Sequence, residues 1–384
     1  MAKTTAKATP VILKDKDLQK LFEILQSKGW ATIGPCIRDG AIVLDELQSA
    51  DDLPIGRTDE QSGGHYRLKP RNDRAHFGYN VGPRSAKGFL HVPRATIWQG
   101  QSADWSHATP SDGPLPKLAF IGIRPCELKA IFVQDEVLLR GPYGDAIYTA
   151  RRKNLFFVVV NCTEAGGTCF CSSMKTGPKA DGGYDIAITE LLENGEPRFL
   201  LQAGSRRGDD LLKDLPTTEA KTADLEQAEQ GYQQAANSMG RHLETNGIRD
   251  LLFDNSEHPR WDETAERCLG CANCTMVCPT CFCVTVEDST SLDGKTAQRE
   301  RRWDSCFTLD FSYIHGGSIR QSSKSRYRQW MTHKLAAWHD QFGMSGCVGC
   351  GRCITWCPVG IDITEEAAVI RHSARIKEAT DGND

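Results

Sequence analysis

The sequence predicts a multidomain protein of the mixed α+β/α-β class. We expect an N-terminal α/β domain, a helical connector and a C-terminal α-helical domain built around cysteines. Continuous apolar runs lie before residue 205, a stretch rich in Ala, Gln and Glu begins near residue 209, and most of the 16 cysteines follow residue 262. These three observations place the domains at residues 1–205, 206–262 and 263–384.

An amphipathic helix is predicted near the start of the N-terminal domain. Within residues 16–30, apolar side chains recur on one helical stripe, at Leu18, Leu21, Phe22 and Leu25. Residues 34–98 are rich in Gly, Pro and Arg with short apolar alternations, so we expect small strands and loops there.

Two buried strands are predicted next. The apolar runs at residues 117–123 and 154–160 are typical of strands that are covered on both faces of a sheet. Pro125 marks a helix start between them, because proline is favoured in the first helical turn. This strand–helix–strand order indicates a parallel α/β unit. Residues 184–191 and 198–204 predict two further strands.

The remaining segments are predicted to be helical. Residues 209–238 are polar and rich in Ala, Gln and Glu, which favours a helical connector. Residues 322–342 also predict helix, within the cysteine-rich domain. We expect the connector to keep the cysteines of the two domains apart.

Composition limits the classes of function. The net charge of −4 argues against nucleic acid as a partner, and no apolar run is long enough to cross a bilayer, so we expect no membrane insertion. The N-terminus carries no apolar core of a signal peptide, so we expect a cytoplasmic protein. Because cytosolic thiols stay reduced, clustered cysteines there indicate metal binding or redox chemistry rather than disulfides.

Two runs of the form C-x2-C-x2-C-x3-C-P are the most specific feature of the sequence. They read CLGCANCTMVCP from residue 268 and CVGCGRCITWCP from residue 347. This is the spacing of two-cluster ferredoxins, in which the fourth cysteine of each run binds the other cluster. It predicts two [4Fe-4S] clusters in a ferredoxin-like C-terminal domain. Zinc is the alternative, but it prefers thiolates arranged as two pairs.

The rule that the fourth cysteine of each run binds the other cluster, which we call the crossing rule, assigns the ligands. Iron would be bound through the cysteines of the two sets that follow. The first ferredoxin set is Cys268, Cys271, Cys274 and Cys357. The second ferredoxin set is Cys347, Cys350, Cys353 and Cys278.

A further group of cysteines follows the two predicted parallel strands. Such strands end at the same edge of a sheet, where α/β folds place their ligands. The glycines of the loop TEAGGTCFC allow it to turn back toward that edge. We call these residues the N-terminal set: Cys126, Cys162, Cys169 and Cys171. They predict a third [4Fe-4S] cluster, with zinc or inert buried thiols as the alternatives.

Other candidate ligands are assigned to packing. Cys281, Cys283 and Cys306 lie outside the runs. They are spare ligands, a further metal site that lacks an obvious fourth ligand, or packing around the nearer cluster, which we favour. Cys36 has no spaced partner and is expected to be an ordinary buried thiol. We expect five histidines to be packing or surface residues: His65, His76, His91, His315 and His333.

These motifs together resemble a known family. The segments IGIRPCELKAI, NCTEAGGTCFCSSMKTGP, CLGCANCTMVCPTCFC, RRWDSC and GCVGCGRCITWCPVGIDI are similar to the iron–sulfur beta subunit of cytoplasmic NAD(P)-linked nickel–iron hydrogenases, also called sulfhydrogenases. The likeness runs from about residue 30 to residue 365. The corresponding electron-transfer subunit of anaerobic sulfite reductase shares the pattern.

The resemblance implies an electron-transfer subunit. It would relay electrons between a flavin subunit that binds NAD(P)H and the small and large hydrogenase subunits, or serve a sulfite reductase in the same way. The absence of a G-x-G-x-x-G run after a strand agrees with a nucleotide site on another subunit. We assign no catalytic residue and no substrate-converting centre of its own. The alternative from another class is a non-redox scaffold with structural clusters.

Overall fold

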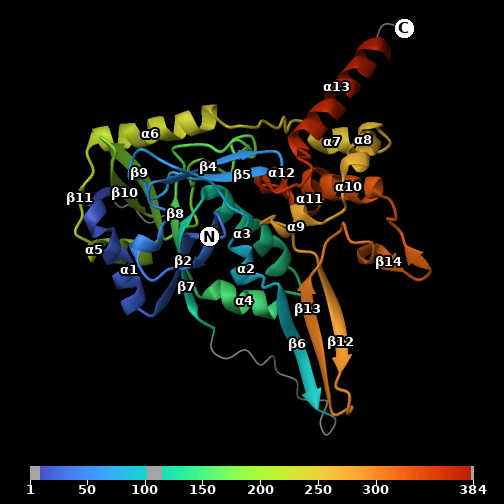
Figure 1. The fold of residues 1–384 in the computed structure, drawn as a ribbon, viewed down its shortest axis with the longest axis horizontal. Helices are drawn as coiled ribbons and strands as arrows, with labels where there is room; N and C mark the ends of the chain where they lie inside the picture. The colour runs from blue at the N-terminus through green and yellow to red at the C-terminus, as the bar shows by residue number, and fades with distance from the viewer. Residues whose placement is uncertain (1–8, 102–114, 382–384) are drawn as a thin grey trace.

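An eight-stranded mixed sheet forms the largest part of the molecule (Figure 1). The computed structural model describes residues 9–101 and 115–381. In spatial order the strands are β11 (Thr218–Glu219), β1 (Val11–Lys14), β10 (Glu196–Ala203), β9 (Ile186–Glu193), β8 (Leu155–Val160), β7 (Lys117–Ile123), β2 (Trp30–Arg38) and β3 (Ala41–Glu46). The four central strands β9, β8, β7 and β2 are parallel, and the outer strands pair antiparallel.

Helices cover both faces of this sheet. They are α1 (Leu18–Ser27), α2 (Lys87–Leu90), α3 (Pro125–Leu138), α4 (Ala146–Lys153), α5 (Arg206–Lys213) and α6 (Thr222–Asn237), with short 3-10 turns at Asp15–Asp17 and Ala50–Asp52. Side chains of β8 alternate between two cores: Phe156 and Val158 pack with α1, whereas Phe157 and Val159 pack with α3. This double burial explains the continuous apolar run and confirms the predicted parallel α/β unit.

The other predicted elements of this half are also confirmed. The α1 stripe buries Leu18, Leu21, Phe22 and Leu25. Strands β9 and β10 occupy the two segments expected after residue 184. The connector is helical, but it is not a free linker, since Ala228 and Tyr232 of α6 pack on Leu191 and Leu200 of the sheet.

The cysteine-rich half is mainly helical. Its helices are α7 (Ile248–Asp254), α8 (Arg260–Arg267), α9 (Asn273–Met276), α10 (Ser323–Thr332), α11 (Trp338–Phe342), α12 (Arg352–Thr355) and α13 (Ile363–Asp381). A π-helical turn, His333–Ala337, joins α10 to α11, and a 3-10 turn spans Asp310–Ser312. The predicted helix at 322–342 is therefore confirmed with a π-helical interruption.

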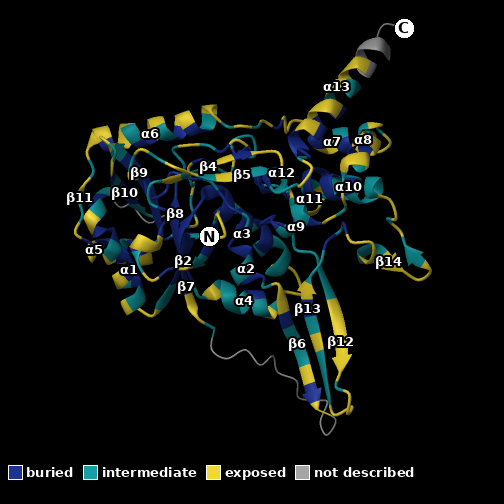
Figure 2. Ribbon diagram, viewed as in Figure 1, coloured by how far each residue is buried: buried dark blue, intermediate teal, exposed yellow. Residues whose placement is uncertain are grey.

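A three-stranded arm extends from the body, with mostly exposed and half-exposed residues (Figure 2). It contains β6 (Arg94–Gln101), β12 (Val284–Thr290) and β13 (Thr296–Trp303), with β13 in the centre. Two small hairpins, β4–β5 (Arg57–Ser62, His65–Pro70) and β14–β15 (Tyr313–Ile314, Gly317–Ser318), complete the strands.

Strand pairing crosses the expected domain boundaries. Strand β6 from the N-terminal part pairs with β13 from the cysteine-rich part, and β11 of the connector pairs with β1. The boundaries at residues 205 and 262 stay a prediction. In the part of the chain that the structure describes, no helix combines the length and apolarity needed to span a membrane.

Candidate metal centres

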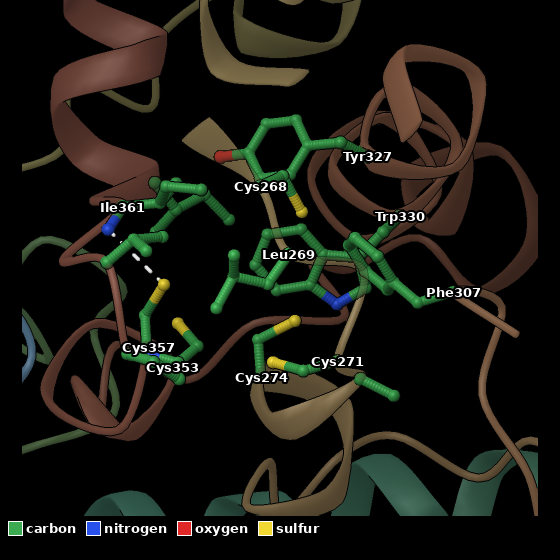
Figure 3. A pocket seen from close by; sticks show the side chains of 14 residues that line it. Cys268, Leu269, Cys271, Cys274, Phe307, Tyr327, Trp330, Cys353, Cys357 and Ile361 are labelled. Carbon is green, nitrogen blue, oxygen red and sulfur yellow. Dashed lines mark hydrogen bonds between the residues drawn. The ribbon is translucent and has the colours of Figure 1, made fainter. Parts of the chain in front are cut away.

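The first ferredoxin set lines one cavity. Figure 3 shows Cys268, Cys271 and Cys274 on one side of this cavity and Cys357 on the other. The walls are apolar, with the rings of Phe307, Tyr327 and Trp330 among them. Thiols from both cysteine runs therefore line one apolar pocket, the arrangement that the crossing rule predicts.

Backbone amides point at the thiols of this cavity. Gly270 N donates to Cys268 Sγ at 3.4 Å, and Ile361 N donates to Cys357 Sγ at 3.3 Å. Such bonds stabilise negative charge on sulfur and tune the potential of a bound cluster. Cys271 is exposed and Leu269 is 66% exposed, so this cavity lies at the molecular surface.

The second ferredoxin set is more deeply enclosed. Cys278 and Cys350 are buried, and Cys278 interacts electrostatically with Cys347 and Cys353. Gly349 N donates to Cys347 Sγ at 3.4 Å, repeating the amide contact of the first set. The structure thus brings Cys278, from the end of the first run, toward the thiols of the second run.

A buried lysine contacts this second set. Lys334 Nζ donates to Cys278 Sγ at 3.5 Å, to Thr280 Oγ1 at 2.9 Å and to the Gly346 carbonyl at 3.2 Å. A hydrogen bond from Cys281, followed by the charge of Lys334, holds the pKa of Cys278 well below its ordinary value.

The cysteines outside the runs gather beside Cys278. All of these are free thiols; Cys281 forms a hydrogen bond with Cys278, and Cys283 forms one with Cys306. The Cys283–Cys306 hydrogen bond lowers the pKa of Cys283 to about 7. A second buried lysine, Lys87, lies near these thiols and stacks its ammonium 3.9 Å from the centroid of the Trp303 ring.

The N-terminal set converges as predicted. Cys126 is the second residue of α3 and Cys162 follows β8, while the loop after Cys162 returns Cys169 and Cys171. Each of these thiols interacts electrostatically with at least one of the others. Burial raises the pKa of all four, that of Cys169 to about 12, so iron would bind them with release of protons.

The N-terminal set is not separated from the ferredoxin sets, and the expectation that the connector keeps them apart is wrong. Cys350 of the second ferredoxin set packs with Cys126 and Cys171 in one buried cluster. The loop docks through its backbone, with Phe170 N donating to the Gly349 carbonyl at 2.9 Å. A Cβ on Gly349, whose φ is +66°, would lie 2.6 Å from the Phe170 oxygen, so this contact requires glycine.

Buried arginines make the N-terminal set suited to an anionic cluster. Arg124 is buried beside Cys162 and donates to the carbonyls of Phe77 and Tyr79. Arg352 is 1% exposed, and its charge acts on Cys350 and Cys126. The Arg352 side chain also hydrogen-bonds to Cys350, so a buried donor faces this sulfur. The residues present therefore fit an iron–sulfur group.

The structure leaves the remaining candidates apart from these sets. Cys36 lies in the core of the main sheet and is 2% exposed. His76 and His91 are buried in packing positions, His65 and His333 are half-buried, and His315 is exposed. Within the described ranges, no group of three or more His, Cys, Asp or Glu residues, the three cysteine sets included, is arranged to hold a single metal ion. A [4Fe-4S] cluster, by contrast, is held by four cysteines at four different iron atoms.

Sequence reasoning missed the buried cations Arg352 and Arg124, although Arg352 lies inside the second cysteine run and Arg124 precedes Cys126 by two residues. The basic residues of segment 322–342, Lys334 among them, could be expected beside negatively charged clusters or on a docking face. The sequence did not show which thiol Lys334 contacts, since Cys278 is 56 residues away.

Comparison with known proteins agrees with this geometry. Residues 267–361 match the family model of the 4Fe-4S dicluster domain. The chain is 32% identical over 279 residues to sulfhydrogenase 2 subunit beta of Pyrococcus furiosus, an alignment that covers 72% of this chain and 79% of that protein. No solved structure matches the chain.

Proposed function

Because this chain belongs to the family of sulfhydrogenase beta subunits, we propose that it relays electrons between a flavin subunit that binds NAD(P)H and the nickel–iron hydrogenase subunits. The relay uses a [4Fe-4S] cluster in each ferredoxin set and a third cluster in the N-terminal set. When bound, these clusters would accept and donate single electrons, which is the redox chemistry that the relay needs.

One observation carries the proposal: the three cysteine sets are neighbours. Cys353 belongs to the second ferredoxin set and also lines the cavity of the first. Cys350 packs on Cys126 and Cys171 of the N-terminal set. The sets therefore follow one another from the exposed Cys271 into the interior, which is the arrangement that an electron relay needs.

The surrounding residues support redox work in three ways. Aromatic side chains of α10 form part of the apolar wall of the first cavity. Backbone amides donate to sulfur and stabilise added negative charge. The cations Lys334, Arg352 and Arg124 offset the charge of thiolates that lie away from solvent.

The test is reduction of the clusters with and without a flavin partner. The anaerobically purified chain is mixed with NADPH, and cluster reduction is followed by the loss of visible absorbance. We expect no reduction by NADPH alone and rapid reduction once the flavin subunit is added. Dithionite is the control, because it shows that the clusters of each sample are reducible.

Two outcomes contradict the proposal. Oxidation of NADPH by the flavin-free chain would place the nucleotide chemistry on this subunit. Clusters that dithionite reduces, but that NADPH with the flavin subunit leaves oxidised, would favour a scaffold with structural clusters.

A further inference from the structure

Lys334 is a buried cation that contacts a thiol of the second ferredoxin set. It is 6% exposed, and the π-helical turn directs its ammonium toward Cys278. Its other donor bonds go to a hydroxyl and a carbonyl. Among the residues that the structure describes, no carboxylate oxygen lies within 4 Å of its ammonium.

A buried ammonium without a counter-ion is costly, because the low-dielectric interior does not replace its hydration. Thiols on neighbouring elements favour the charged form of Lys334, namely Cys278, Cys281, Cys347 and Cys353, whereas the second buried lysine, Lys87, repels it. Neutral thiols would leave this charge unbalanced. The four ligand thiolates of a bound cluster would make the site net negative and supply the missing counter-charge.

The first ferredoxin set has a different environment. Its cavity is lined by cysteines, apolar residues and aromatic rings, and by no charged side chain in the described ranges. Arg326, the cation that acts on Cys268, donates instead to the carbonyls of Arg320 and Gln321. Two sets with the same cysteine spacing therefore differ in the charge beside their sulfurs.

We propose that Lys334 raises the reduction potential of the cluster held by Cys278, Cys347, Cys350 and Cys353. The relayed electron then resides mainly on this cluster. The proposal builds on the electron-relay function above. Reduction adds a negative charge to the cluster, and a fixed ammonium 3.5 Å from one of its sulfur ligands stabilises that added charge. Lys334 is a positioning residue, since it acts through Cys278.

The test compares Lys334→Met and Lys334→Gln with Lys334→Arg in the reconstituted full chain. The readouts are iron content and the midpoint potential of each cluster, from redox titration followed by electron paramagnetic resonance. The signal of the second ferredoxin set is the one that Cys278→Ser alters. Lys324→Met is the matched control, because Lys324 lies on the preceding helix and is paired with Asp262 at 2.9 Å.

We expect both neutral variants to keep their iron and to lower the potential of this cluster by at least 59 mV, which is a tenfold shift of a one-electron equilibrium. Lys334→Arg and Lys324→Met should shift it by less than that. An unchanged potential at full iron content would overturn the proposal. Loss of the cluster in both neutral variants would also overturn it, because the lysine would then be structural. The potentials need no partner subunit, so either failure is distinct from failure of the relay.

Discussion

A buried ion pair joins the cysteine-rich half to the main sheet. Arg352 Nη2 lies 3.1 Å from Glu127 Oε2, with the side chains 1% and 3% exposed. Arg352 Nε also donates to the Gly82 carbonyl at 2.7 Å, and Glu127 accepts from Ala86 N at 2.6 Å. Because Glu127 follows Cys126 and Arg352 lies between Cys350 and Cys353, the pair fixes two cysteine sets relative to each other.

Removing the carboxylate should be strongly destabilising. Glu127→Gln leaves the Arg352 charge buried without its partner, so we expect the free energy of unfolding to fall by about 3–5 kcal/mol. Thermal unfolding under anaerobic conditions, followed by circular dichroism and cluster absorbance, measures the change. The control is Glu193→Gln, whose side chain is 70% exposed beside Arg198 and should cost less than about 1 kcal/mol. Equal effects of the two substitutions would show that the buried pair has no special role.

At the scale of single residues, the sequence predicts which thiols come together better than it predicts which charged side chains lie beside them. The spacing of each run is local, so the cavity that unites Cys357 with Cys268 could be expected from it. The partners of Lys334 and Arg352 come from distant segments, and a single sequence does not contain that proximity. The ligand roles of all twelve cysteines in the three sets stay predictions that the geometry supports.

Among the elements, buried strands were the easiest to predict. Apolar runs identified β7 and β8 because both faces of these strands are covered. The hairpin of β12 and β13 was missed, although apolar and polar residues alternate at the start of segment 284–290 and Asp293–Gly294 is a turn signal. Its partner β6 lies almost 200 residues earlier in the chain, so the arm as a whole was not visible in the sequence.

The arm should lose its order if its central strand is interrupted. Gln298 lies in β13, opposite Ser289 of β12 and Gln99 of β6. Gln298→Pro removes a backbone donor from a central strand, so we expect faster hydrogen exchange in residues 94–101 as well as in the hairpin. Peptide-level hydrogen exchange with mass spectrometry provides the measurement, and Gln298→Val is the matched control. Unchanged protection of β6 would mean that it does not depend on β13.

The whole molecule is held together by the cysteine loops as much as by its sheet. The loop that carries Cys169 and Cys171 packs on the second run at Gly349 and Gly351, where added Cβ atoms would lie 2.6 and 2.4 Å from carbonyl oxygens of that loop. These contacts use backbone atoms, so they do not require the thiols themselves. Cluster binding by the N-terminal set can therefore be removed while the docked loop is retained.

The number of clusters decides whether the N-terminal set is a redox centre. Three [4Fe-4S] clusters correspond to about 12 iron atoms per chain, four for each cluster. Changing Cys169 and Cys171 together to serine should remove roughly a third of the iron and one reducible signal. We expect the two ferredoxin clusters to remain, because the Phe170–Gly349 backbone bond is unaffected.

Iron analysis and redox titration of the reconstituted protein measure this. Cys36→Ser is the control, since Cys36 is equally buried but lies in the core of the sheet, and it should keep all the iron. About eight iron atoms in the unaltered, fully reconstituted chain would contradict a third cluster. The four thiols beside Arg124 and Arg352 would then serve packing between the halves, and electrons would travel through the ferredoxin sets alone.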